Sequence, residues 1–195
     1  MQETVKLKKD LNAVQIPFGT PTFLNKGTEV VITYSLGGSY TIETDSNLYR
    51  VDNKNADALG KTPEPLFTPA ENENATLEDR IWALLRSCYD PEIPVNIVDL
   101  GLIYGVEIKK TTEKQGSDYE KRVRPQSKQE DRFDVKIKMT LTAPGCGMGP
   151  IIADDAKTRV ATLPEVNSVE VEMVFDPPWD RSMMSDQAKL ELGML

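Results

Sequence analysis

The stretch from 138 to 150, KMTLTAPGCGMGP, constrains the fold more than any other, because a strand pattern there meets a glycine-rich turn and then a helix pattern. Apolar and polar residues alternate from 133 to 141, which is the period of a half-buried strand. Pro150 suits the first turn of a helix, and apolar residues then recur at helical spacing as far as Leu163. Cys146 is therefore predicted to lie at a junction between a strand and a helix.

Cys146 in this setting is predicted to be a reactive or metal-binding thiol. Backbone N–H groups and the positive end of a helix dipole favour a thiolate at such a junction. Gly145, Gly147 and Gly149 are expected to leave room for a ligand to approach the sulfur. The alternative is that Cys146 fills the core as a small hydrophobe, as most free cysteines do. The three glycines favour the thiol site, because a core residue does not need a loop without side chains around it.

The chain offers few residues for catalysis or soft-metal binding, since it has two cysteines and no histidine. This excludes Ser-His-Asp and Cys-His pairs, and any soft-metal site must be shared with another subunit, a partner or a small thiol. The net charge of −8 argues against nucleic acid and anionic membrane surfaces as partners. The sequence has no apolar run long enough for a membrane span and no signal-peptide pattern, so we expect a cytoplasmic location, where a disulfide is not expected.

The fold is predicted to be α+β, with a small β-rich module at 1–60, a Pro-rich linker at 61–75 and a compact domain at 76–195. In the module, Gly37-Gly38 and Asp45-Ser46-Asn47 mark turns among three or four strands. The domain reads helix, strand, strand, helix, strand, helix, with the helices on one face of a small mixed sheet. A polar segment at 109–132 is expected to be a solvated insertion.

Acidic residues next to prolines form a second candidate site. Pro91 and Pro94 are predicted to hold Asp90 and Glu92 on a stiff, exposed turn, and Asp99 precedes a strand. These carboxylates could serve acid–base chemistry, partner docking or a hard cation. Equally, Asp90 could accept N–H bonds within its loop and Asp99 could cap a turn.

Two further residues have alternative interpretations. Trp179, in a stiff Pro-Pro-Trp turn, is predicted to be a core residue or a lid over the cysteine loop, with a partner anchor as the alternative. Cys88 is predicted to be a core residue at the end of the first helix of the domain.

Three motifs give the chain a family resemblance: DPEIPVNIVDLGLIY at 90–104, MTLTAPGCGMGP at 139–150 and DPPWDRSMMSDQAKLELGM at 176–194. With the N-terminal LGGSYTIETDSNLYRVDNKNADALGK, the chain resembles the SufT proteins. These are a branch of a small-domain family that also includes PaaD and the eukaryotic cytosolic iron–sulfur targeting factors. The segment at 109–132 is longer than the usual hairpin of that family, which leaves open any partner surface across it.

The resemblance implies a factor that carries, transfers or targets iron–sulfur clusters and is not an enzyme. The characteristic cysteine of the family corresponds to Cys146, with Thr142, Gly145 and Gly147 beside the cluster. Its acidic turn and strand-leading aspartate correspond to Asp90, Glu92 and Asp99, which with Trp179 are candidates for partner binding or support.

The number of available ligands limits how this chain could hold a cluster. Clusters usually need four thiolates and Cys146 supplies one, so the cofactor is predicted to be transient and to bridge two chains or a chain and a client. The expected partners are an assembly scaffold, apo-protein clients and a second copy of the chain. One alternative is a metal-free adaptor that docks apo-proteins through the Asp90 loop, Trp179 and the β module. A weaker one is a thiol-dependent enzyme with Asp90 or Glu92 as base.

Overall fold

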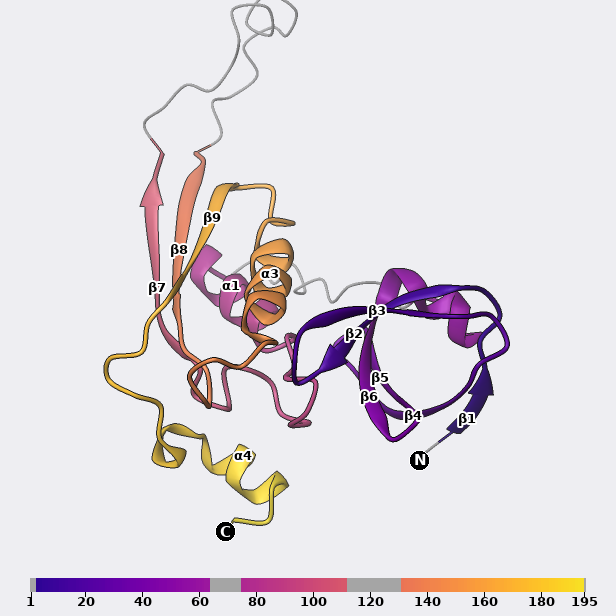
Figure 1. Cartoon of the computed structure of the whole chain (residues 1–195). Coiled ribbons are helices and arrows are strands. Elements are labelled where there is room, and N and C mark those ends of the chain that lie inside the picture. The colour runs from indigo at the N-terminus through magenta and orange to yellow at the C-terminus, as the bar shows by residue number, and fades with distance from the viewer. Residues whose placement is uncertain (1–2, 64–74, 112–130, 195) are drawn as a thin grey trace, which may run out of the picture.

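A computed structural model describes residues 3–63, 75–111 and 131–194 and contains two separate β-sheets (Figure 1). One sheet has six strands in the order β1-β4-β5-β6-β2-β3, and the other has three in the order β7-β8-β9. The α+β prediction is confirmed. Most of the predicted linker and most of the predicted polar insertion, residues 64–74 and 112–130, lie outside the described ranges, and β7 includes the first two residues of that insertion.

The six-stranded sheet forms a β module that curls around its own buried core (Figure 1). All of its neighbouring strands are antiparallel. The sequence predicts only three or four strands here, because β1 and β3 lie at the edges of the sheet, are mostly exposed and show little apolar alternation. The strands are β1 (Glu3–Lys6), β2 (Leu11–Ile16), β3 (Thr20–Leu24), β4 (Glu29–Leu36), β5 (Ser39–Thr44) and β6 (Asn47–Asp52), and the 3-10 helix η1 (Asn53–Leu59) follows.

The two predicted turns of the β module are confirmed. Gly37 and Gly38 connect β4 to β5 with φ angles of 58° and 76°. Asp45 and Ser46 connect β5 to β6 with φ angles of 49° and 60°. Two residues with positive φ are what a tight hairpin with the right-handed twist of a sheet requires.

The rest of the chain follows the predicted order of helices and strands. β7 is antiparallel to β8, and β8 is parallel to β9, so the small sheet is mixed. Helices α1 and α3 cover one face of it (Figure 1), and their apolar residues share one buried cluster with those of β8. The elements are α1 (Leu77–Leu85), β7 (Ile103–Lys110), β8 (Phe133–Met139), α3 (Gly149–Val160), β9 (Val166–Met173), the 3-10 helix η2 (Arg181–Met183) and α4 (Asp186–Glu191).

The helix ends follow the sequence signals. Thr76 and Asp79 form a reciprocal capping box at the start of α1, and Ser185 caps α4. Pro150 occupies the first turn of α3. Cys88 is fully buried after α1, which confirms its prediction as a core residue, and burial raises the pKa of its thiol to about 12.

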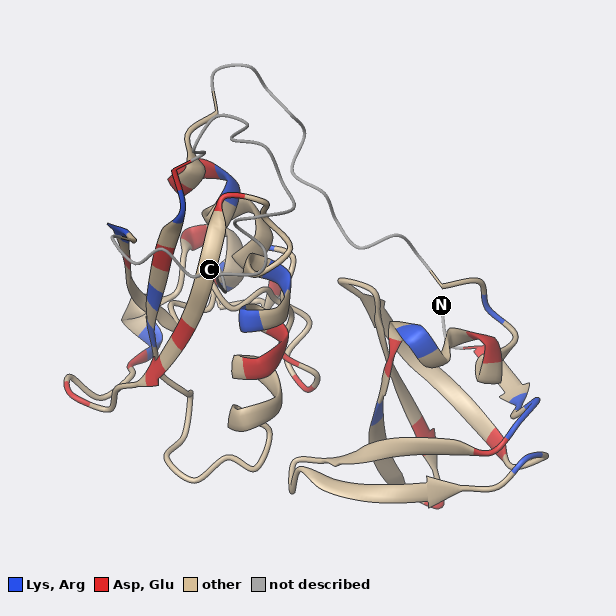
Figure 2. Ribbon diagram, turned by 90° about the horizontal axis from the view of Figure 1, so that it is seen from above, with Lys and Arg blue, Asp and Glu red and all other residues tan. Residues whose placement is uncertain are grey.

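Helix α3 lies between the two sheets (Figures 1 and 2) and carries the polar contacts that join them. Arg159 of α3 donates to the carbonyl oxygen of Gly37 and, at 3.1 Å, to Ser87 Oγ. Asp155 of α3 accepts from Arg159 at 3.0 Å and lies 3.2 Å from the guanidinium of Arg50 in β6. Both arginines are buried, at 4–5% exposure.

A cavity of about 580 Å³ lies beside these contacts, between β6, η1 and α3. Among the described residues, no helix is long and apolar enough to cross a membrane.

Candidate functional site

The cysteine loop, residues 140–148, connects β8 to α3, and Cys146 lies in it between the exposed residues 143–145 and the start of α3. The backbone N–H of Cys146 donates to the carbonyl oxygen of Ala143 at 3.4 Å, and the carbonyl oxygen of Cys146 accepts from the N–H of Gly149 at 3.1 Å. Ala143, Pro144 and Gly145 are exposed, Cys146 is half-buried, and Met148 is fully buried. The loop therefore holds Cys146 at the boundary between solvent and core rather than inside the core.

The two glycines of the loop and Gly149, the first residue of α3, differ in their surroundings. Gly145 has a φ of +84°, and a Cβ there would meet nothing within 4 Å. A Cβ on Gly147 would lie 2.2 Å from the carbonyl oxygen of Phe18, and one on Gly149 would lie 2.6 Å from Leu141 Cδ1. The expectation that all three leave room for a ligand is therefore corrected, because only Gly145 faces open space.

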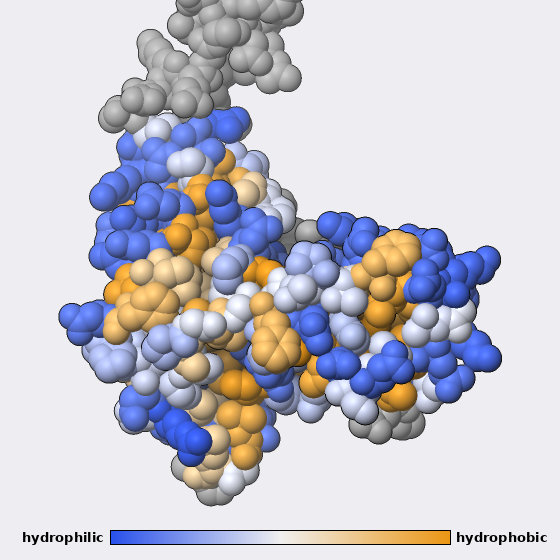
Figure 3. Space-filling view, in the orientation of Figure 1, coloured by the Kyte–Doolittle hydropathy of each residue, from blue (hydrophilic) through white to orange (hydrophobic). Residues whose placement is uncertain are grey.

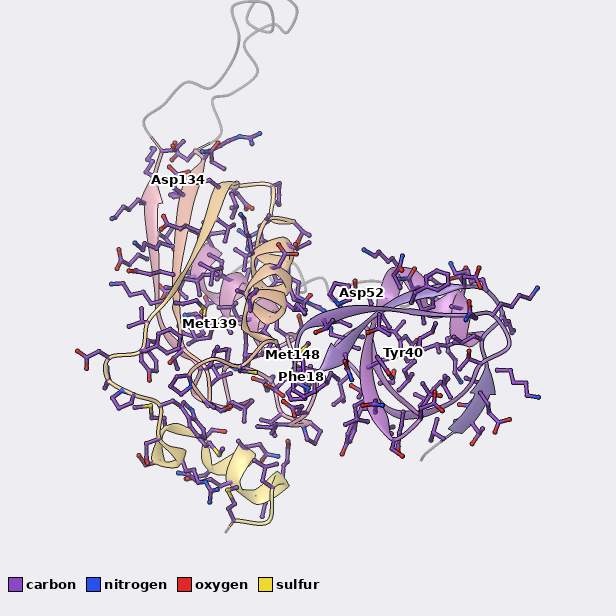
Figure 4. All side chains as sticks on the ribbon, viewed as in Figure 1. Phe18, Tyr40, Asp52, Asp134, Met139 and Met148 are labelled. Carbon is purple, nitrogen blue, oxygen red and sulfur yellow. The ribbon has the colours of Figure 1, made fainter. Side chains whose placement is uncertain are left out.

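The β module thus forms part of the surroundings of Cys146, which the sequence does not predict. Its turn between β2 and β3 brings the backbone of Phe18 against Gly147, in the region that Figure 4 labels with Phe18 and Met148. A Cβ on Gly19 would lie 2.2 Å from the carbonyl oxygen of Gly147, so the two backbones touch with no side chain between them. The only sequence signal for this contact is a glycine in each of two segments that are far apart in the chain.

The acidic turn after α1 is less open than predicted. Asp90 is buried, at 9% exposure, and Oδ1 of its carboxylate accepts the N–H groups of Glu92 at 2.8 Å and Ile93 at 2.9 Å. The carbonyl oxygen of Pro91 accepts from Thr41 Oγ1 in β5 at 3.1 Å, so the β module covers part of the turn. The prediction of an exposed Asp90 is wrong, and the alternative that it accepts N–H bonds within its loop is confirmed.

Burial also shifts the pKa of these carboxyl groups. Removal from water raises the pKa of Asp90, and the two N–H donors only partly oppose this. Glu92 is exposed as predicted, but partial desolvation and the neighbouring Asp90 raise its pKa as well.

Asp99 is part of a turn rather than a free carboxylate. Its side chain accepts from Asn96 Nδ2 at 2.5 Å, while Asn96 Oδ1 accepts the N–H groups of Val98 and Asp99. Asn96 is therefore the residue that caps this turn. The backbone carbonyl of Asp99 accepts from the N–H of Ser185 at 2.8 Å, which connects the turn to the start of α4.

Trp179 lies at the other end of the cysteine loop. Its indole N–H donates to the carbonyl oxygen of Leu100 at 2.9 Å, and its half-buried ring packs against the core. With Thr142 it lines a cavity of about 300 Å³ whose walls do not include Cys146. Apolar surface is exposed in this region, near the cysteine loop and α4 (Figure 3). Trp179 is thus in part a core residue, and it lies near the start of the loop rather than over the thiol.

The described residues contain no group of three or more His, Cys, Asp or Glu side chains that could hold a metal ion. Both cysteines are free, and Cys88 is fully buried. Within this part of the chain, Cys146 is the only thiol placed to bind a soft metal, and it supplies a single ligand.

Comparison with known proteins places this loop within a conserved family model. The model, described as an iron-sulfur cluster assembly protein, matches residues 78–113 and 130–173. These ranges include the Asp90 turn, Asp99 and the cysteine loop, and they exclude the β module.

Three curated relatives match the chain over nearly their whole length. An Fe-S protein maturation auxiliary factor of Porphyromonas gingivalis is 40% identical over 124 residues, which is 64% of this chain and 98% of the relative. The auxiliary factor YitW of Bacillus subtilis is 39% identical over 118 residues, or 60% of this chain and 95% of the relative. The auxiliary factor SufT of Staphylococcus aureus is 38% identical over 105 residues, which is 54% of this chain and 96% of the relative.

Proposed function

This chain belongs to the family of iron–sulfur cluster assembly proteins, and from that premise we propose that it matures iron–sulfur proteins by carrying or transferring a cluster through Cys146. The resemblance to the SufT proteins is confirmed by these relatives. One observation supports the assignment to Cys146 above all: it is half-buried in the cysteine loop, whereas Cys88 is fully buried.

The ligand count determines the form in which a cluster is held. A cluster usually takes four thiolates, and Cys146 supplies one of them. The remaining ligands come from a second copy of the chain, an assembly scaffold or an apo-protein client. A cluster held by one thiolate per chain leaves easily, which suits transfer and does not suit storage.

The residues around Cys146 support such a site in different ways. Cys146 lies just before the N-terminus of α3, where the helix dipole favours an anionic ligand. Gly145 leaves open space beside it, and Thr142 lies at the start of the same loop, so we keep both as cluster neighbours. Gly147 faces the β module on one side, and its contribution is through the backbone of the loop.

The wider assignments belong to the same proposal. We assign a non-catalytic role, because the relatives are named as auxiliary factors and Asp90, one of the two suggested bases, is engaged by N–H groups of its own turn. We divide the chain into a β module at 1–60, a linker at 61–75 and the family domain at 76–195. Two free cysteines fit a reducing compartment, so we place the protein in the cytoplasm.

Anaerobic reconstitution with iron and sulfide tests the proposal. We expect wild type to develop iron–sulfur absorbance with less than one cluster per chain, and Cys146→Ser to lose most of the bound iron. Cys88→Ala is the matched control, because it removes the other cysteine from a site that a metal cannot reach, and it should load like wild type. An equal cluster load in Cys146→Ser would refute the role of this thiol.

The metal-free adaptor is less well supported as a second function. Its expected docking elements are the Asp90 loop, Trp179 and the β module, but the Asp90 carboxylate is buried and the carbonyl oxygen of Pro91 bonds to the β module. The exposed Glu92 and the apolar surface near Trp179 remain as its docking candidates. Undiminished binding of an apo-protein client by Cys146→Ala, with no chromophore in wild type purified without oxygen, would favour the adaptor.

A further inference from the structure

We propose that the turn of the β module at 17–19 is a positioning element of the Cys146 site, which closes one side of the cysteine loop. The partner that supplies the other cluster ligands then approaches from the opposite side, past Ala143 and Gly145. The inference deepens the proposed function, because it concerns access to the thiol on which that function depends.

The contact between the turn and the loop is unusually close for two segments of backbone. A Cβ on Gly147 would lie 2.2 Å from the carbonyl oxygen of Phe18 and 2.8 Å from that of Pro17. A Cβ on Gly19 would in turn lie 2.2 Å from the carbonyl oxygen of Gly147. No side chain fits at either position without a shift of the backbone, since non-bonded contacts of a Cβ atom essentially never fall below 3.0 Å. Gly147 follows Cys146 directly, so the turn lies one peptide unit away from the residue that carries the thiol.

The turn itself is fixed on both sides. The N–H of Gly19 donates to the carbonyl oxygen of Gln15 at 2.9 Å, and Gln15 Nε2 donates to Asn47 Oδ1 at 3.1 Å. Ile16, the residue before the turn, is 5% exposed and belongs to the buried cluster that also contains the core residues of β8 and α3. The end of β2 is therefore anchored in the core of the family domain rather than resting on its surface.

Further contacts fix the β module against the same domain. The ion pair of Arg50 with Asp155 and the bond from Arg159 to Gly37 connect it to α3. A Cβ on Gly37 would lie 2.3 Å from the carbonyl oxygen of Ser87, which is a second close approach of the two backbones. The turn at 17–19 is thus one of several contacts that set the position of the module.

The opposite side of the loop is open. Ala143, Pro144 and Gly145 are exposed, and a Cβ on Gly145 would meet no atom within 4 Å. The two sides of Cys146 therefore differ: Gly147 is covered by backbone, while Gly145 faces solvent. A partner that shares a cluster with Cys146 needs that open side.

Thiol labelling tests the inference without any cluster. We propose to measure the rate at which N-ethylmaleimide labels Cys146 in the full chain, in wild type, Gly147→Ala and Gly19→Ala. Each substitution forces the turn and the loop apart, so both should label at least about threefold faster than wild type, because thiol reactivity follows exposure. Gly27→Ala is the matched control, since Gly27 is also a glycine of the β module with positive φ (+88°) but has nothing within 4 Å of its Cβ position. It should label at the wild-type rate.

A rate in both variants that is unchanged, or slower than that of Gly27→Ala, would overturn the inference. Cys88 reports folding in the same experiment, because it is fully buried and is labelled only when the chain unfolds. If Cys88 is labelled in Gly147→Ala, that variant is unfolded, and the labelling rate of Cys146 in Gly19→Ala then decides whether the inference holds. Failure of the chain to take up iron would refute the proposed function and leave the labelling result intact, so the two can fail separately.

Discussion

Asp155 of α3 lies between two buried arginines, one from the β module and one from α3 itself. Its two carboxylate oxygens lie 3.0 Å from Arg159 Nε and 3.2 Å from Arg50 Nη2. Arg50 has no hydrogen-bond acceptor for Nε and Nη1 among the described residues, and Asp52 Oδ1 lies 3.8 Å from Nε, so Asp155 is the nearer of its two acidic partners. Asp155→Ala therefore leaves two buried guanidinium groups without their shared carboxylate.

The expected loss of stability follows from this burial. Removing one partner of a buried ion pair costs about 3–5 kcal/mol, because the other charge stays buried without compensation. The side chain of Asp155 is 19% exposed, and Arg159 keeps Ser87 and Gly37 as acceptors, so we expect the lower end of that range. A loss of about 3 kcal/mol corresponds to a decrease in Tm of about 6–12 °C for a chain of this size.

Thermal and urea unfolding followed by circular dichroism measure this loss. Asp154→Ala is the control, since Asp154 is the preceding residue of the same helix, is exposed and has no ion pair in the part of the chain that the structure covers. It should change the stability by less than about 0.5 kcal/mol. If Asp155→Ala came within about 1 kcal/mol of this control, the ion network would not hold the two units together and the reasoning would be wrong.

Three further predictions concern buried groups. Burial raises the pKa of Asp90 above its ordinary 3.8, so the folded state binds more protons than the unfolded state above pH 3.8 and loses stability as the pH rises. Asp90→Asn keeps the N–H acceptor without the charge and should raise Tm at pH 7 but not below pH 3.8; a lower Tm at pH 7 would contradict this. Because the pKa of Cys88 is about 12, maleimide at pH 7 should label one thiol per native chain, that of Cys146, and two in guanidinium chloride. Mass spectrometry counts the labels, and two on the native chain would be the contrary result. The buried hydroxyl of Thr140 has no partner among the described residues, so Thr140→Val should stabilise the chain by about 1 kcal/mol in urea unfolding, and a loss of stability would reveal a partner.

The fold of the family domain could be predicted because its signals are local. Alternation from 133 to 139 follows β8, Thr76 caps α1, and Pro150 lies in the first turn of α3. The β module was harder to predict, since β1 and β3 lie at sheet edges and show little apolar alternation. Local periodicity describes an element that buries one face, and an exposed edge strand has little of it.

The site was predicted only where one segment carries it. Cys146 at the junction of β8 and α3 was found from its own surroundings in the sequence. The contact of the β module with Gly147 could not be found in this way, because it depends on the backbone of Phe18, which is remote in the sequence. A glycine required by a close backbone contact and a glycine required by a ligand look the same in a sequence. Asp90 was placed on the surface for a similar reason, since nothing in its own turn indicates that β5 covers it.

The direction of β8 has a practical consequence. The strand starts at Phe133, next to the bond from Thr111 to Arg132 that closes the β7–β8 ladder, and it ends just before the cysteine loop. Seven residues of extended chain therefore set the hairpin end about 20 Å from the loop. Residues inserted at that end of the hairpin therefore lie far from Cys146 and need not change its surroundings. A fluorophore attached at Thr111 or Arg132 would report the arrival of a large partner from a position that the partner does not need to touch.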